Sequence, residues 1–188
     1  MDDRTLRVAI IVIGHLMWLS TAALRALRGH REHRVVRRAS WFVESYPVLV
    51  WIPLVLATIL FKGSVEIADG LQLAGVAFAL AGALFAAWAM WSLGRSYGVR
   101  TDLFAGHRLK TDGPFALVRH PMYLGILVYH VGASLALESP TLLASTALAV
   151  LPYTAARIVA EERVLRAGFV DEYERYRARV PTLLPLPR

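Results

Sequence analysis

The chain has 188 residues, of which 56% are hydrophobic and 19% are charged, and its mean hydropathy is +0.48. Soluble domains carry about 25% charged residues, and about 20 helical residues cross a bilayer, so the long uncharged runs exclude a soluble protein and indicate a polytopic membrane protein. The chain has no cysteine, which excludes thiol catalysis, and its net charge of +7 lies in loops beside apolar runs, a pattern of membrane topology rather than nucleic-acid binding.

The first two predicted spans flank the most positive segment of the chain. Val8 to Leu24 is uncharged and is interpreted as an uncleaved span rather than a signal peptide. The segment from 25 to 38 carries six arginines against one glutamate, which predicts that it is cytoplasmic. The second span runs from about Trp41 to Phe61 and has Glu44 near its entry. The short loop at 62–69 then lies on the opposite side.

The third predicted span, Leu71 to Leu93, has small residues at regular spacing. They recur every four residues at Gly75, Ala79 and Ala83, with Gly82 and Ala86 beside them. Small residues let helices approach closely in lipid, so the stripe predicts tight helix packing rather than chemistry. The loop that follows, 94–119, is again net positive and is expected on the same side as the first arginine segment.

The last two spans form a predicted helical hairpin. Span four starts at Pro121 and runs to about Leu137, a tight turn follows at 138–140, and span five covers 141–160 with Pro152 inside it. The tail at 169–179 places three aromatic residues on one helical face: Phe169, Tyr173 and Tyr176. It is expected to be an amphipathic helix on the cytoplasmic face.

These elements predict an all-α fold, a polytopic membrane helix bundle of about five transmembrane helices in a single domain, 1–188. The topology puts the N-terminus outside and the C-terminus in the cytoplasm, within an inner or plasma membrane. A cofactor pocket is expected on the cytoplasmic side.

Three polar clusters are expected to converge at one membrane face: the loop around His107, the helix start at Arg119 and His120, and the end of span five. The free N–H groups at the start of span four, together with Arg119, favour an anionic group. Arg157 and Glu161 are four residues apart and share a helix face, which suits an intrahelical ion pair or a catalytic pair. His107 and His120 are not at metal-ligand spacing with a matched carboxylate, so no metal is predicted.

Several motifs occur in a fixed order over residues 92–181. They are Ser92-Leu93-Gly94-Arg95, Gly106-His107-x-Leu109-x-Thr111-x-Gly113-Pro114, Arg119-His120-Pro121-x-Tyr123-x-Gly125, Arg157-Ile158-x-x-Glu161-Glu162-x-x-Leu165, Phe169 and Tyr173-x-x-Tyr176. In this order they resemble the isoprenylcysteine carboxyl methyltransferase family, to which the phospholipid N-methyltransferases are related. Ser96-Tyr97-Gly98 departs from the Asn-Phe-Ser that the family often has there, which leaves the acceptor open.

The resemblance implies an S-adenosylmethionine-dependent methyltransferase that acts on a lipophilic acceptor, an isoprenoid-type carboxylate or another small lipid O or N acceptor, and releases S-adenosylhomocysteine. It implies that the cofactor is bound by His107, Leu109, Gly113, Arg119, His120, Tyr123, Glu162, Tyr173 and Tyr176. By the same resemblance, Arg157 and Glu161 are the catalytic residues and face the acceptor and the transferring methyl group.

Two other interpretations remain open: a membrane NADPH-dependent sterol or isoprenoid reductase, and a non-catalytic membrane scaffold. The Glu161-Glu162 pair and the short chain favour the methyltransferase. A small acceptor entering from the bilayer is favoured over a protein acceptor, with membrane lipids as the other partners and neither nucleic acid nor metal.

Overall fold

The computed structural model describes residues 4–5, 7–9, 11–16, 19, 23, 35–37, 65–93, 103–104 and 108–184. The elements are β1 (Val35–Arg37), α4 (Asp69–Leu93), β2 (Leu103–Phe104), the 3-10 helix η2 (Gly113–Ala116), α5 (Pro121–Ala136), α6 (Pro140–Ser145), the π-helix η3 (Thr146–Val150) and α7 (Leu151–Arg179). The bounds of α4 and α5 agree with predicted spans three and four. Predicted span two, Glu44 and His107 lie outside the described residues.

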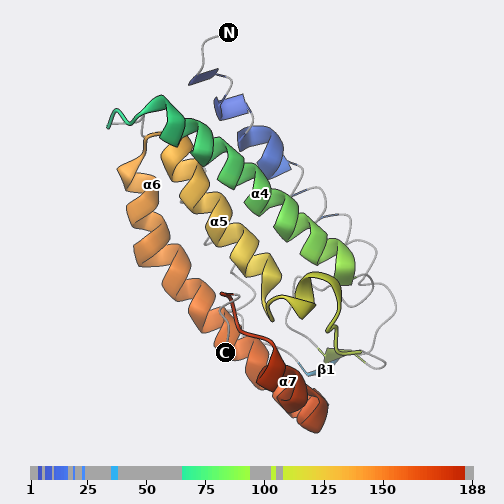
Figure 1. Ribbon diagram of the computed structural model, residues 1–188. Coiled ribbons are helices and arrows are strands. Elements are labelled where there is room, and N and C mark those ends of the chain that lie inside the picture. Colours follow the sequence, from blue (N-terminus) through green and yellow to red (C-terminus); the bar gives the residue numbers. More distant parts are fainter. Residues whose placement is uncertain are drawn as a thin grey trace.

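Helices α4 and α5 run antiparallel and side by side at the centre of the molecule (Figure 1). Glycines on each helix face the backbone of the other: a Cβ on Gly82 would lie 2.5 Å from the Tyr129 nitrogen, and one on Gly132 would lie 2.3 Å from the Ala79 nitrogen. The small-residue stripe of α4 is buried in this contact, as the sequence predicted. The two backbones therefore touch without intervening side chains.

Replacing Gly82 with alanine is expected to destabilise the protein by about 1–3 kcal/mol, because the added methyl group must push α5 away. The obstacle is backbone, since the Gly125 carbonyl oxygen would lie only 2.6 Å from the new Cβ. Gly70→Ala is the matched control, because nothing lies within 4 Å of its Cβ position. Thermal unfolding in detergent measures both variants. Equal unfolding temperatures would show that the close approach contributes nothing to stability.

The predicted hairpin between spans four and five is present. Ser139 caps α6 by accepting a hydrogen bond from the Leu142 N–H at 3.2 Å, and Pro140 occupies the first helical turn. The helix continues from α6 through η3 into α7, and the wide π turn ends just before Pro152. Proline has no N–H to donate to the preceding turn. The structure therefore accommodates Pro152 with a π turn within a continuous helix.

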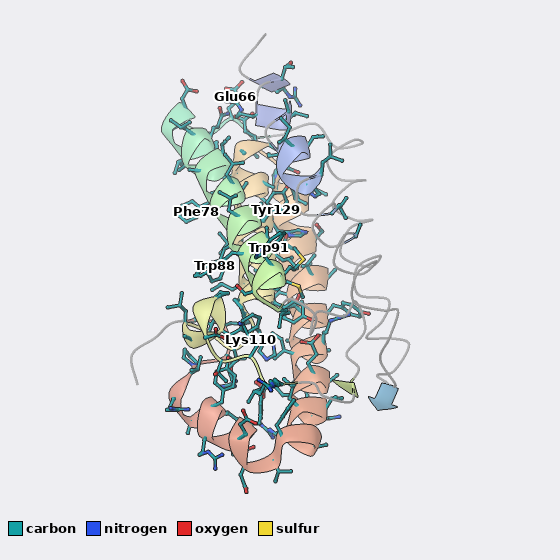
Figure 2. All side chains as sticks on the ribbon, turned by 90° about the vertical axis from the view of Figure 1, so that its right-hand side faces the viewer. Glu66, Phe78, Trp88, Trp91, Lys110 and Tyr129 are labelled. Atoms are coloured by element: carbon teal, nitrogen blue, oxygen red, sulfur yellow. The ribbon has the colours of Figure 1, made fainter. Side chains whose placement is uncertain are left out.

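Among the described residues, two helices are long and apolar enough to cross a membrane: α4 and the continuous helix Pro140–Arg179. Helix α5 is apolar but shorter, and the described part of the N-terminal helix is shorter again. The predicted number of five spans is thus not established by the described residues. Phe78 and Trp88, 56% and 46% exposed, project from α4 on the side away from Tyr129 (Figure 2).

The described part of the N-terminal helix packs on α4 and α5. Ile11 belongs to the core cluster that contains Ala79, Ala83 and Tyr129. The Tyr129 hydroxyl donates a hydrogen bond to the Ile11 carbonyl at 3.0 Å and also contacts His15. His15 is therefore packed and hydrogen-bonded at a helix contact, as expected of a lone histidine in a span.

The described structure is helical, as predicted, apart from one small sheet that the sequence did not predict. β1 pairs with β2 in antiparallel fashion, with Val35 opposite Phe104 and Arg37 opposite Leu103. Segments of two and three residues are too short to show the alternating pattern that marks a strand in sequence. The pairing joins the first arginine-rich segment to the loop 94–119, and the two had been expected on the same side.

The end of α7 differs from the predicted separate tail helix. Helix α7 continues to Arg179 but is kinked at Val170, whose φ of 23° and ψ of −99° are not helical. The last turns bend back across the end of the bundle, as the red end of α7 shows (Figure 1). Tyr173 and Tyr176 share a face, as predicted, and both are buried. The tail is therefore packed against the protein.

Candidate functional site

Six polar side chains meet at the end of the bundle where α5 begins. Three come from the start of α5, three come from α7 beyond its apolar part, and residues 180–184 run back beside them. They are Arg119, His120, Tyr123, Arg157, Glu161 and Glu162. The approach is possible because α5 starts directly at Pro121 while α7 extends past the bundle end. We call this group the polar cluster.

Tyr123 joins Arg157 to Glu161. Its hydroxyl accepts a hydrogen bond from the Arg157 Nε at 2.5 Å and donates one to Glu161. The Arg157 Nε also lies 3.1 Å from Glu161 Oε1, so the ion pair expected from the i, i+4 spacing is present. Tyr123 is 1% exposed and Arg157 4%. The pair is thus held from across the bundle and is more than a surface ion pair.

His120 stands between two carboxylates. Its Nδ1 lies 3.6 Å from Glu161 Oε2, and its Nε2 lies 3.4 Å from Glu162 Oε1. Burial opposes protonation of the ring, but the hydrogen bonds and charges of the two glutamates outweigh it, so the pKa of His120 is raised. Each ring nitrogen of His120 therefore faces a carboxylate, and the contact with Glu162 is within hydrogen-bond distance.

Both glutamates are held ionised. Burial opposes ionisation of Glu162, yet hydrogen bonds from His120 and Arg119 and their positive charges lower its pKa to about 2. For Glu161, burial is likewise outweighed by the hydrogen bond from His120 and the charge of Arg157, so its pKa is lowered. The two carboxylates therefore face the guanidiniums of Arg119 and Arg157 and the imidazole of His120.

Arg119 ties the cluster to the tail. Its Nε and one Nη bond Glu162 at 3.0 and 2.8 Å, and that Nη also donates to the Thr182 hydroxyl at 2.7 Å. The other Nη donates to the carbonyls of Val180 at 2.6 Å and Arg177 at 3.3 Å. A guanidinium has five N–H donors. The five hydrogen bonds of Arg119 therefore give each donor an acceptor within the protein. Arg119 also satisfies carbonyls at the C-terminal end of α7, where helices leave them unpaired.

The two tyrosines of α7 close the cluster from the tail side. The Tyr176 hydroxyl donates to the Phe115 carbonyl at 2.7 Å and so fastens α7 to η2. Tyr173 is fully buried beside Arg119 and Glu162, and its hydroxyl makes no hydrogen bond of normal geometry with the described residues. Its side chain therefore lies within the candidate site.

The structure brings together most of the residues proposed from the sequence. The assembled ones are Arg119, His120, Tyr123, Arg157, Glu161, Glu162, Tyr173 and Tyr176. Leu109 lies in an irregular stretch before η2. Gly113 has φ +59°, a left-handed backbone that favours glycine, and it faces Ser92 and Trp88 of α4. Its conformation explains the glycine without a ligand.

Sequence reasoning missed the contribution of the chain after α7. The Arg119 N–H donates to the Pro181 carbonyl at 2.8 Å, and the His120 N–H donates to the Thr182 carbonyl at 3.1 Å. Residues 180–184, which we call the C-terminal strap, therefore lie along the residues that precede α5. Pro181 signals a helix end in the sequence, but nothing there indicates where the following residues dock.

A model of the family described as "Phospholipid methyltransferase" matches residues 71–172. The protein-S-isoprenylcysteine O-methyltransferase of Schizosaccharomyces pombe is 35% identical over 119 residues, which are 61% of this chain and 50% of that protein. The human protein-S-isoprenylcysteine O-methyltransferase is 31% identical over 156 residues, 82% of this chain and 51% of that protein. This chain thus spans about half the length of these relatives.

A solved structure of a protein from the same group of methyltransferases is also similar to this chain. The eukaryotic intramembrane Ras methyltransferase, an isoprenylcysteine carboxyl methyltransferase, matches with a TM-score of 0.60 and 25% identity, covering 80% of this chain and 55% of that one. The matched region of the family model contains α4, α5 and α7 up to residue 172. The polar cluster therefore lies within the matched part, while the strap lies beyond the end of the family model.

Proposed function

The chain belongs to the phospholipid methyltransferase family, and we propose that it is an integral membrane methyltransferase that uses S-adenosylmethionine to methylate an acceptor with a lipophilic group. The observation that carries the proposal is the polar cluster, in which residues from the start of α5 and from α7 meet beside the strap and belong to the set that the resemblance implied. The resemblance to the isoprenylcysteine carboxyl methyltransferase family is confirmed by the relatives and by the solved structure.

The residues present fit this cofactor. The Tyr173 hydroxyl is buried and makes no hydrogen bond of normal geometry with the described residues, and the Glu161 side chain is 18% exposed at the edge of the cluster. A carboxylate suits a sulfonium or an ammonium group, and a hydroxyl suits a polar atom of the ligand. We propose that His120, Tyr123, Glu162, Tyr173 and Tyr176 hold the cofactor. The roles of His107, Leu109, Gly113 and Arg119 as cofactor ligands remain predictions from the resemblance.

When bound, S-adenosylmethionine supplies an electrophilic methyl group on a sulfonium, and S-adenosylhomocysteine is the product. The protein's part is to align the acceptor and to exclude water, since charge is dispersed rather than created in such a transfer. Arg157 orients the acceptor by its positive charge, and Tyr123 and Glu161 fix the direction of its guanidinium. An acceptor that is already a carboxylate needs no general base.

The guanidinium of Arg157 supports a carboxylate acceptor. It is buried and held by Tyr123 and Glu161, and guanidinium groups pair well with the negative charge of a carboxylate. Phenol and amine acceptors lack that charge and need a base, for which Glu161 is the nearest group. The names of the relatives specify protein-borne S-isoprenylcysteine. We therefore propose an isoprenylated carboxylate on a protein, in place of the small acceptor favoured from the sequence.

We further propose that the cluster faces the cytoplasm. The arginine-rich segment 25–38 and the loop 94–119 carry the positive charge that marks cytoplasmic loops. The pairing of β1 with β2 supports placing these two segments on one side. A soluble cofactor would then arrive from the cytoplasm, while a lipophilic acceptor enters through the bilayer.

Binding of S-adenosylhomocysteine to the purified protein in detergent tests the cofactor. At a hundred times its dissociation constant, a ligand that binds only the folded protein stabilises it by about 2.7 kcal/mol. We expect this compound to raise the unfolding temperature and NADPH to leave it unchanged. A rise with NADPH alone would support the reductase, and no rise with either would favour the non-catalytic scaffold.

Labelled methyl transfer then tests the acceptor. The protein is offered a small S-isoprenylcysteine and, separately, a protein that ends in S-isoprenylcysteine. We expect label on the protein acceptor as a base-labile methyl ester. Label on the small compound alone would restore the preference drawn from the sequence, and label on lipid amines would move the acceptor to the phospholipid class.

A further inference from the structure

The C-terminal strap is connected to the Arg157–Glu161 pair by an unbroken series of polar contacts. We propose that the strap positions Glu161 through Arg119, Glu162 and His120, so that a docked strap is required for efficient methyl transfer. Thr182 and Arg119 are then positioning residues for the reaction. This inference rests on the proposed function and adds a region that lies beyond the match to the family model.

The first link joins the strap to Glu162. The Thr182 hydroxyl accepts from an Arg119 Nη at 2.7 Å, and the same Nη bonds Glu162 Oε1 at 2.8 Å. Because all five Arg119 donors have acceptors within the protein, its guanidinium cannot turn without breaking several bonds. Arg119 is 7% exposed, so water does not readily replace a lost partner. The position of Glu162 therefore depends on the strap.

The second link joins Glu162 to Glu161 through one imidazole. His120 faces Glu162 with Nε2 and Glu161 with Nδ1, at 3.4 and 3.6 Å. Because the imidazole ring is rigid and contacts both carboxylates, a shift of Glu162 moves His120 and thereby Glu161. Its backbone is held as well, since the His120 N–H donates to the Thr182 carbonyl at 3.1 Å. Glu161 in turn contacts Tyr123 and Arg157.

The arrangement of the chain explains why this connection exists. The kink at Val170 turns the last helical turns of α7 back, and the strap then returns toward the start of α5 (Figure 1). The strap thus meets the Arg119 guanidinium, where one Nη bonds both Glu162 and Thr182. The methyl-transfer site is completed by the last segment of the described chain.

The test is a double-mutant cycle on the chain of residues 1–188, with a protein ending in S-isoprenylcysteine as acceptor. Thr182→Val removes the hydroxyl and keeps the shape and the backbone bonds of the strap. His120→Asn keeps an amide near the Nδ1 position but does not reach Glu162, so it cuts the second link. Thr146→Val is the control, because the hydroxyl of this buried threonine donates to the Leu142 carbonyl of its own helix, away from the polar cluster.

We expect Thr182→Val to lower kcat about tenfold, the order expected for losing a hydrogen bond to a charged group. Its dissociation constant for S-adenosylhomocysteine should stay within about twofold, and Thr146→Val should leave kcat unchanged. In the His120→Asn background, Thr182→Val should cause no further loss of kcat, because the strap is already disconnected from Glu161. Its effect on the unfolding temperature should be the same in both backgrounds.

Two results would overturn the inference: an unchanged kcat in Thr182→Val, or the same fractional loss in both backgrounds, which is the behaviour of a merely stabilising contact. Arg119→Lys is a second check, since one ammonium cannot hold the strap carbonyls and Glu162 together; we expect a larger loss of kcat than in Thr182→Val. Failure of the unaltered chain to transfer methyl groups contradicts the proposed function instead, and is seen before any substitution is made.

Discussion

Replacing Glu161 with glutamine is expected to lower methyl transfer at least about a hundredfold while binding of S-adenosylhomocysteine stays measurable. Glutamine keeps the size of the side chain and an oxygen for the Tyr123 hydroxyl, but it removes the charge that faces Arg157 and His120. Breaking a buried ion pair costs about 3–5 kcal/mol because the partner charge is left uncompensated. About 3 kcal/mol of lost alignment corresponds to a hundredfold in rate.

Glu172→Gln provides the control for Glu161→Gln, because Glu172 is an exposed glutamate of the same helix. Labelled methyl transfer gives the rate, and the rise in unfolding temperature with S-adenosylhomocysteine reports cofactor binding. If Glu161→Gln keeps its full rate, Glu161 belongs only to an ion pair. If it loses the cofactor completely, Glu161 is a cofactor ligand first and its effect on the rate is secondary.

Replacing Arg157 with lysine is expected to lower kcat/KM for the acceptor about tenfold to a hundredfold with little change in cofactor binding. Lysine keeps the positive charge but has one compact donor group in place of a planar guanidinium. It cannot contact the Tyr123 hydroxyl and Glu161 as the Arg157 Nε does and also offer a fork to a carboxylate. The loss should therefore appear mainly in the KM of the acceptor.

Arg163→Lys is the control for Arg157→Lys, since Arg163 is an exposed arginine two turns further along α7. Initial rates over a range of acceptor concentrations separate KM from kcat. A loss of affinity for S-adenosylhomocysteine with an unchanged acceptor KM would assign Arg157 to the cofactor. It would also remove the main support for a carboxylate acceptor.

Several features of the site were predictable because they depend on local spacing. Arg157 and Glu161 are four residues apart, and one helical turn brings such residues together wherever the helix lies. Pro121 begins α5, as its fixed φ and missing N–H favour. The small residues of α4 had to be buried because only a close helix contact makes use of them in lipid.

Other features required the tertiary structure. The guanidinium of Arg119 was expected to attract an anionic ligand, yet the protein itself supplies acceptors for its donors, two of them carbonyls of Arg177 and Val180. Arg119 and Val180 are 61 residues apart in the chain, so no local sequence pattern predicts their contact. A local sequence pattern likewise does not predict the pairing of the two short strands, β1 with three residues and β2 with two.

The sequence by itself determined the long apolar helices, their close packing and the order of the motifs, because hydropathy, helical periodicity and residue size act over a few neighbouring residues. Only the tertiary structure decided which charges meet, because a buried ion pair depends on the positions of segments far apart in the chain. His120 shows the difference: its place at the start of α5 follows from Pro121, but its position between Glu161 and Glu162 depends on how α7 crosses the end of the bundle.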